Sequence, residues 1–510
     1  MLAGCDSGQP VSDPENPRTA GSESQQSTAP AAVATPAGRL DLRCDDAAVY
    51  SAAWMECEAR SYSLIRKGLE ESLANPTLQR ASLEQAARQS GDFLLQVLDD
   101  PSRLNTLLSP SSLAMLAVMG DPFRHPQSAG PNGRRFYEEE AEVQPVLFFD
   151  RTCARLQGQV WQPRSRLPGQ TLPAVVINNG SVIGTQHMYF WAAQALVRAG
   201  YMVMTFDHRS QGRSDAIAPD GSVGSNLDPS VFWLNLVDAI DFLRSGPSRP
   251  HPLQQRCAGT SATTAFNPFH ATLDPDRLGA VGHSFGAAGV TFAQSYGAPG
   301  ADHWPGLLDT ENPIKAIVAW DALGHPNSPI NANGGALFRS LGNLAGPTYN
   351  LTGTAYPAIV PRVPALDLPT DFGALSAPHL LGEQKDHFMP AFKLWRTSGL
   401  STMVVVPHAS THTQYSQNPF IPASSWCGDP SVEACNTGWV IPMATHYTVA
   451  WFDRWLKQAG EPGYRTADSR LLDNGNSLTG AVNMSWHYLS ARHLVDRSGQ
   501  LHECLDLRRC

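Results

Sequence analysis

One serine stands in a setting that suits nucleophilic chemistry. Ser284 lies in the sequence Gly-His-Ser-Phe-Gly, with Gly282 and Gly286 on either side. Glycine at both positions permits a turn so sharp that bulkier side chains would clash. The strand-like run "RLGAVGHS" precedes the turn, and the small residues "AAGVTFAQ" follow it with a helical pattern. This context predicts a serine on a strand–turn–helix elbow of the G-x-S-x-G type.

Such a serine needs a base, because its hydroxyl is a weak nucleophile at neutral pH. His412 is our candidate, since it follows the apolar run "STMVVVP" that we expect to be the last core strand. His408 lies at the edge of the same run and is its rival. His446 opens the last predicted helix, where we expect it to cap or pack. His408 and His412 also have the spacing of a zinc pair, but no third ligand is apparent, so we expect no metal.

The acid that would orient the base has three candidates. Asp321, Asp371 and Asp386 all follow Ser284, precede His412 and lie near the ends of predicted strands. The order serine, acid, histidine is the one expected for the α/β-hydrolase fold. The other aspartates would then be helix caps, turn formers or ion-pair partners. The residues alone leave the choice of acid open.

Two backbone amides are candidates for holding an oxyanion. The first is the N–H of Phe285, directly after the nucleophile. The second is the N–H of Ser181, in the loop after the strand-like run "AVVINNG". Gly180 would let that loop approach a substrate closely. Chemistry of this kind needs no metal and no organic cofactor.

The elements that must position these residues alternate between strands and helices. After the hairpin-like run "PVLFFDRTCARLQGQVWQP", short apolar strands and helical segments follow one another to about residue 458. That alternation predicts parallel strands joined by crossover helices. We therefore expect an α/β-hydrolase fold, with a mostly parallel central sheet, flanking helices, an N-terminal helical extension and a lid insertion.

The N-terminal extension contains one clear helical pattern. Ser82 and Gln85 form a capping-box pattern, apolar residues including Leu83, Leu94 and Leu98 recur at helical spacing, and Pro101 closes the segment. We expect this helix to begin near Ser82 and to pack on the main domain. The expected divisions are 1–38 (lipobox and disordered tether), 39–135 (helical extension), 140–460 (catalytic domain), 323–362 (lid-like insertion within it) and 461–510 (a tail that does not fit the sheet).

Charge and hydropathy exclude several classes of partner. The chain of 510 residues has a formal net charge of −9, so no excess of basic residues invites nucleic acid or an anionic lipid surface. No apolar run approaches the roughly 18 residues that a transmembrane helix needs. We expect a small-molecule or polymeric ester as substrate, no nucleic acid, and membrane contact only through a lipid anchor.

Export is suggested by the N-terminus and by the cysteines. The sequence Leu2-Ala3-Gly4-Cys5 is similar to a bacterial lipobox, which predicts lipidation of Cys5, and residues 6–38 are rich in Ser, Pro, Ala, Gly and Gln. Eight further cysteines are an even number, typical of disulfides in an exported chain. The close pairs Cys427–Cys435 and Cys504–Cys510 are the simplest expectations. We expect a lipoprotein on the periplasmic or cell-surface side of the membrane.

Several runs together resemble a secreted bacterial α/β-hydrolase, close to plasma-type platelet-activating factor acetylhydrolases and cutinase-like polyester hydrolases. They are "INNGSVIGT", "GYMVMTFDHRSQGRSD", "VGHSFGAAGV", "IVAWDALG", "VPALDLPTDFGALSAP" and "MVVVPHASTHTQYS". The resemblance covers about 145–458 and implies an ester hydrolase whose acid is Asp321, with Asp371 matching a later acidic-aromatic pair. Asn179-Gly180 replaces the His-Gly of the acetylhydrolases, so the phospholipid substrate is not carried over.

These observations favour a serine carboxylic-ester hydrolase that works through an acyl-enzyme, with Ser284, His412 and Asp321 as its triad. A peptidase or amidase could use the same triad. A catalytically silent, surface-anchored binding protein on a hydrolase scaffold is the alternative from another class.

Overall fold

The computed structural model describes only part of the chain. The described residues are 51–53, 56, 76–108, 136–167, 169–181, 184–257, 263–326, 356–370, 385–407, 410, 412–416, 440–472, 488–507 and 510. They all belong to the compact unit Leu40–Cys510. The tether with Cys5, most of the expected lid, the pair Cys427–Cys435, Asp371 and His408 lie outside these ranges.

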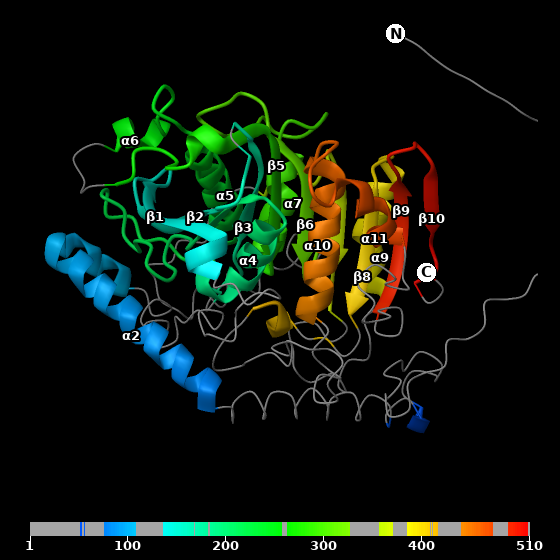
Figure 1. Ribbon diagram of the computed structural model, residues 1–510, viewed down its shortest axis with the longest axis horizontal. Helices are drawn as coiled ribbons and strands as arrows, with labels where there is room; N and C mark the ends of the chain where they lie inside the picture. Colours follow the sequence, from blue (N-terminus) through cyan, green and yellow to red (C-terminus); the bar gives the residue numbers. More distant parts are fainter. Residues whose placement is uncertain are drawn as a thin grey trace, which may run out of the picture. The chain divides into compact units, whose positions relative to one another are not determined.

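Ten strands form one sheet, in the order β1-β2-β4-β3-β5-β6-β7-β8-β9-β10. The six strands from β4 to β8 pair in parallel, and antiparallel pairs flank them at both edges (Figure 1). The strands are β1 Ala141–Phe149, β2 Arg155–Pro163, β3 Leu172–Asn178, β4 Met202–Phe206, β5 Leu273–His283, β6 Ile314–Trp320, β7 Ala365–Leu368, β8 Thr402–Pro407, β9 Tyr488–Val495 and β10 Leu501–Cys504.

Helices cover both faces of this sheet. Side chains of α4 (Phe190–Arg198) and α10 (Val440–Leu456) share one buried core with the strands, and those of α5 (Pro229–Leu243), α7 (Phe285–Ser295) and α9 (Lys385–Thr397) share the other. The central strands are therefore buried on both sides, which explains why they read as continuous apolar runs. This is the expected α/β-hydrolase fold. The shorter helices are η4 Phe136–Glu140, η5 Gln186–Tyr189, α6 Pro252–Arg256, η6 His270–Thr272, η9 His412–Tyr415, η12 Tyr464–Thr466 and α11 Ala467–Leu472.

The strand order creates a switch point at β3. The chain passes from β3 through α4 to β4 on one side, and then through α5 to β5 on the other side of β3. Loops at the carboxyl ends of strands diverge at such a point and leave room for a ligand. Gly180, Ser284, Asp321 and His412 all follow the carboxyl ends of strands in this sheet.

The N-terminal helix differs from its prediction in two respects. It runs as α2 over Pro76–Asp99, so the expected start at Ser82 is wrong, and proline at the first position suits a helix start. Pro101 ends it as predicted, and the 3-10 helix η1 (Pro101–Leu108) follows. Leu83, Leu94 and Leu98 are exposed, while Phe93 is 4% exposed. The expected apolar stripe therefore does not face the main domain.

The expectation that the tail lies outside the sheet is wrong. β9 pairs antiparallel with β8, and β10 pairs with β9 (Figure 1, red). Leu489, Ala491 and Leu494 are buried along β9. Because β9 has only short apolar stretches separated by polar residues, its sequence signal is weak, and pairing with β8 determines its conformation.

Two disulfides join described cysteines. Cys504–Cys510 is a pair that we expected, and Cys153–Cys257 is a pair that we did not predict. Disulfides persist in oxidising compartments and are typical of exported proteins. In the described part of the chain, no helix has the length and hydrophobicity to span a membrane.

Candidate active site

Ser284 occupies the sharp turn between β5 and α7. Its backbone angles are φ 59° and ψ −123°, an uncommon conformation for a residue with a side chain. A Cβ on Gly282 would collide with the carbonyl of Gly286, and a Cβ on Gly286 would collide with the carbonyl of Asn178. Both glycines are therefore required by close backbone packing. The turn has the geometry predicted for a nucleophile elbow.

His412 and Asp321 meet at the carboxyl edge of the sheet. Asp321 directly follows β6, and His412 begins η9 after β8. The Nδ1 of His412 lies 2.5 Å from the Oδ2 of Asp321. The amide of Thr370 donates to the other carboxylate oxygen at 3.0 Å, so both oxygens are held. Of the three candidate acids, Asp371 and the side chain of Asp386 fall outside what the structure describes, and Asp321 contacts the candidate base.

The surroundings of Asp321 favour its charged form. Burial alone would raise its pKa, but the hydrogen bond and charge of His412 lower it, with smaller contributions from His283 and the Thr370 amide. The net result is a pKa below the usual range of an aspartate. Asp321 is therefore an anion at neutral pH, as a group that stabilises an imidazolium must be.

A chain of hydrogen bonds connects the loop after β3 to His412. The Gly180 amide donates to the Tyr189 hydroxyl at 3.1 Å, and that hydroxyl lies 2.7 Å from Nδ1 of His283. The Nε2 of His283 lies 2.9 Å from the carbonyl oxygen of His412. Because a carbonyl only accepts, Nε2 of His283 carries its proton, and Nδ1 accepts from Tyr189. We call these four residues the Tyr189–His283 relay.

Tyr189 and His283, the two side chains at the centre of the relay, are buried and neutral. Burial, followed by the neighbouring charge of His412, lowers the pKa of His283 to about 3, and burial raises the pKa of Tyr189 above its usual range. Neither group changes its protonation near neutral pH. Sequence reasoning missed both residues. His283 stands inside the elbow motif, which is the one local signal that could have drawn attention to it, and nothing in the spacing marked Tyr189.

Asp367 is a second buried carboxyl near the candidate acid. It lies on β7 opposite Ala319, is 2% exposed, and accepts a hydrogen bond from the Leu323 amide at 2.8 Å. Burial raises its pKa to about 8; the Leu323 amide opposes this shift and the charge of Asp321 adds to it. Asp367 is therefore protonated at neutral pH and holds the segment after Asp321.

The two candidate oxyanion donors flank the serine. Phe285 begins α7, so its amide belongs to a first helical turn, where amides have no acceptor within the helix. Ser181 follows Gly180, and a Cβ at Gly180 would lie only 3.2 Å from the Cβ of Ser284. Glycine at 180 thus lets this loop lie against Ser284. His446 lies inside α10, which begins at Val440, so the expectation that it opens this helix is wrong. Its Nε2 lies 2.9 Å from the Arg470 carbonyl oxygen, which fits a packing role.

Comparison with known proteins finds distant similarity to solved structures and no similarity at the level of sequence families. No protein-family model matches the chain, and no curated protein sequence does. An esterase of Pyrococcus furiosus is 14% identical over 62% of this chain and 94% of its own, with a TM-score of 0.34. Esterase 2 of Thermogutta terrifontis is 13% identical over 61% and 94%, with a TM-score of 0.38. The AtxE2 isopeptidase is 14% identical over 65% of this chain, which spans 43% of the isopeptidase, with a TM-score of 0.35. At these sequence identities and TM-scores, the similarities do not indicate which reaction this protein catalyses.

Proposed function

We propose that this protein is a serine hydrolase that cleaves carboxylic esters. The observation that carries the proposal is the 2.5 Å contact between Nδ1 of His412 and Asp321, at the same edge of the sheet as the Ser284 elbow. An aspartate on Nδ1 fixes the tautomer in which Nε2 of His412 takes up a proton. Serine, histidine and aspartate then have separate roles as nucleophile, base and orienting anion.

The reaction has two halves. Ser284 Oγ attacks the ester carbonyl while its proton passes to Nε2 of His412, and the carbonyl oxygen becomes an oxyanion. Collapse of this intermediate breaks the ester C–O bond, and the alcohol leaves with the proton from His412. Water, deprotonated by His412, then attacks the acyl-enzyme and releases the carboxylic acid and Ser284.

We assign the binding of the oxyanion to the backbone amides of Phe285 and Ser181. The first turn of α7 offers its amides and the positive end of its dipole to an anion. In the loop after β3, the Gly180 amide already donates to Tyr189, which leaves the next amide, that of Ser181, as the candidate. Two preorganised donors of this kind each contribute roughly 100-fold or more to the rate.

The first test is hydrolysis of p-nitrophenyl esters from acetate to palmitate, with Ser284→Ala as the inactive control. We expect turnover that the variant loses, and the chain-length profile would measure the acyl pocket. A short optimum would agree with the resemblance to acetylhydrolases. Labelling by a fluorophosphonate probe, followed by peptide mass analysis, should locate the adduct on Ser284.

Other outcomes separate the alternatives. A protein that is labelled at Ser284 but cleaves only p-nitroanilides would be an amidase or peptidase on the same triad. A protein that is neither labelled nor active would contradict the proposed enzyme and favour the silent binding protein.

We also propose that Cys5 carries a lipid anchor and that the protein works on the periplasmic or cell-surface side of a bacterial membrane. The lipobox-like sequence and the disulfides support this location. Expression behind a lipoprotein signal should move the protein into the detergent phase, and Cys5→Ser should return it to the aqueous phase. Equal partitioning of both proteins would exclude an anchor at Cys5.

A further inference from the structure

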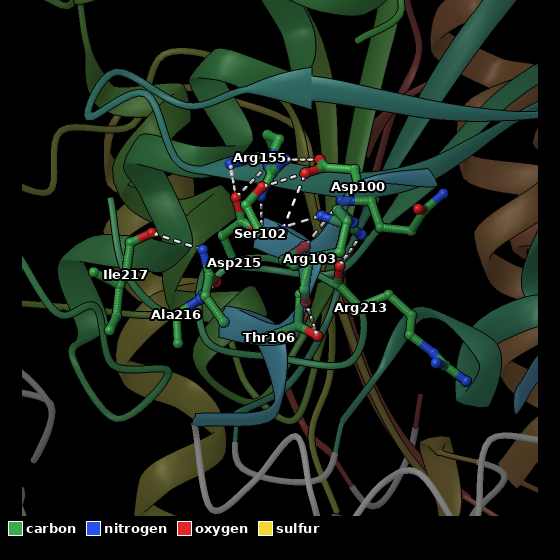
Figure 2. A network of polar contacts seen from close by, with 12 residues as sticks. Asp100, Ser102, Arg103, Thr106, Arg155, Arg213, Asp215, Ala216 and Ile217 are labelled. Carbon is green, nitrogen blue, oxygen red and sulfur yellow. Dashed lines mark hydrogen bonds and ion pairs between the residues drawn. The ribbon is translucent and has the colours of Figure 1, made fainter. Parts of the chain in front are cut away.

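Buried charges join the N-terminal segment to the loop after β4 (Figure 2). Arg103 on η1 donates to Asp215 Oδ1 at 3.0 Å and to the Arg213 carbonyl at 2.7 Å. Arg155 on β2 donates to the other Asp215 oxygen and to Asp100, both at 2.6 Å. The side chains of Arg103 and Asp215 are 2% and 4% exposed. Removing one partner from such a network leaves a buried charge poorly compensated, so the contact resists separation.

Three further contacts, made by Asn105 and Phe93, attach the same loop to the N-terminal segment. Asn105 accepts from the Ala216 amide at 3.0 Å and donates to the Ile217 carbonyl at 3.2 Å. The guanidinium of Arg213 lies 4.3 Å from the ring centroid of Phe93 on α2. The loop is thus held by a side-chain amide, by a cation–π contact and by the ion pairs.

The other side of this loop contacts the segment that we assign to the oxyanion. Gln211 Nε2 donates to the Gly180 carbonyl at 2.7 Å. Asp207 accepts from the Gln186 amide at 2.9 Å and from the Arg213 amide at 3.1 Å. The segment that receives the Arg103 hydrogen bonds is therefore connected to both ends of the 180–186 loop. Gln211 bonds to Gly180 at one end, and Asp207 bonds both to Arg213 and to Gln186 at the other end.

We propose that Arg103 is a positioning residue, which holds the 207–215 loop so that Gln211 keeps the Gly180–Ser181 segment aligned for oxyanion binding. This rests on the proposed function. In this view the N-terminal extension is part of the active-site scaffold. Arg103 contacts no reacting atom and acts through Asp215, the Arg213 carbonyl and Gln211.

Arg103→Met tests the proposal, because methionine keeps much of the side-chain volume and removes the charge and the donors. We expect kcat for p-nitrophenyl acetate to fall roughly 10- to 100-fold, the range for a small misplacement caused by a mutation outside the site. KM should change little. A trifluoromethyl ketone, which adds to the serine and forms an oxyanion, should lose affinity by the same factor as kcat/KM. Arg103→Lys should recover part of the loss.

A double-mutant cycle tests the route through Gln211. Gln211→Ala should reproduce the loss of ketone affinity. The double variant should lose less than the product of the two single losses, because both disturb the same segment. Independent losses would contradict this route. Gln211→Ala and Arg103→Lys also keep the proposal testable if Arg103→Met does not fold.

Arg470→Met is the matched control. Arg470 likewise pairs with a buried carboxylate, Asp453, at 2.5 Å and donates to a backbone carbonyl, that of Gly463, at 3.2 Å. We expect this variant to lower the melting temperature and to leave ketone affinity unchanged. Melting losses in both variants with unchanged ketone affinity would overturn the proposal. Fluorophosphonate labelling of Ser284 in the parent reports on the proposed function separately, whatever Arg103→Met does.

Discussion

The two sides of Ser284 are built differently. On the side to which we assign acid–base chemistry, Asp321 and His412 contact each other directly, and the Thr370 amide donates to the remaining carboxylate oxygen. On the side to which we assign oxyanion binding, neighbouring side chains hold the Gly180–Ser181 segment: the Tyr189 hydroxyl accepts from the Gly180 amide, and Gln211 Nε2 donates to the Gly180 carbonyl. The first side thus depends on one hydrogen bond between a carboxylate and an imidazole, and the second depends on several hydrogen bonds between side chains and the backbone.

This difference predicts how strongly a single substitution on each side should lower the activity. The contact between Asp321 and His412 is lost completely when one partner changes, and the proposed base then loses both its orientation and the anion that would stabilise its protonated form. A backbone loop with several supports shifts by a fraction of an ångström when one support is removed. We therefore expect large single effects on the acid–base side and graded, coupled effects on the oxyanion side.

The largest effect should come from Asp321→Asn. An amide can donate to Nδ1 of His412 and so stabilise the wrong tautomer, and it cannot balance an imidazolium. We expect kcat to fall by about 10⁴-fold, as for the equivalent change in a serine triad. Steady-state kinetics with p-nitrophenyl acetate measure this directly.

The matched variants Asp371→Asn and Asp386→Asn should keep most of the activity. Loss of turnover in either of them, together with an active Asp321→Asn, would assign the acid to Asp371 or Asp386 and would contradict the role proposed for Asp321.

Among the remaining changes next to Ser284, Tyr189→Phe should have the largest effect, because Tyr189 connects the two sides. Loss of its hydroxyl leaves the Gly180 amide without its acceptor and His283 Nδ1 without its donor, each at a cost of about 1–3 kcal/mol for a buried group. We expect kcat to fall roughly 10-fold, with a matching loss of trifluoromethyl ketone affinity. Unchanged ketone binding would show that the relay does not position the oxyanion loop.

Asp367→Asn should affect stability and leave kcat near that of the parent at neutral pH, because asparagine resembles the protonated carboxyl. The folded pKa of about 8 lies above the ordinary value, so the folded state binds the extra proton. Stability from this group is therefore complete below about pH 4 and is lost as pH rises toward 8. Relative to the parent, the variant should gain melting temperature between pH 5 and pH 9. A constant difference across that range would contradict the shift.

Much of this arrangement could be predicted from local sequence. The two glycines around Ser284 indicated the elbow, and alternating apolar runs indicated the strands that carry Asp321 and His412. These signals are local because a tight turn and a buried strand each restrict the residue types within a few positions.

The supports of the site could not be predicted, because their partners are distant in the chain. Arg103 and Asp215 are 112 residues apart, and Tyr189 and His283 are 94 apart. Each is an ordinary polar residue in its local sequence, and only the fold brings the partners together. For the same reason β9 was missed, since its conformation depends on pairing with β8.

The smallest catalytic effect should come from opening the disulfide Cys504–Cys510 with a double change to serine. This bond closes a loop with a sequence separation of 6 at the edge strand β10, away from both sides of Ser284. The chain-entropy relation gives about 2 kcal/mol for such a loop, against nearly 5 kcal/mol for a loop as long as that of Cys153–Cys257. We expect a lower melting temperature with unchanged kcat and unchanged ketone affinity. If kcat fell as much as in Tyr189→Phe, general destabilisation would suffice to explain the losses on the oxyanion side. The loss in Tyr189→Phe would then not indicate that Tyr189 positions the oxyanion loop.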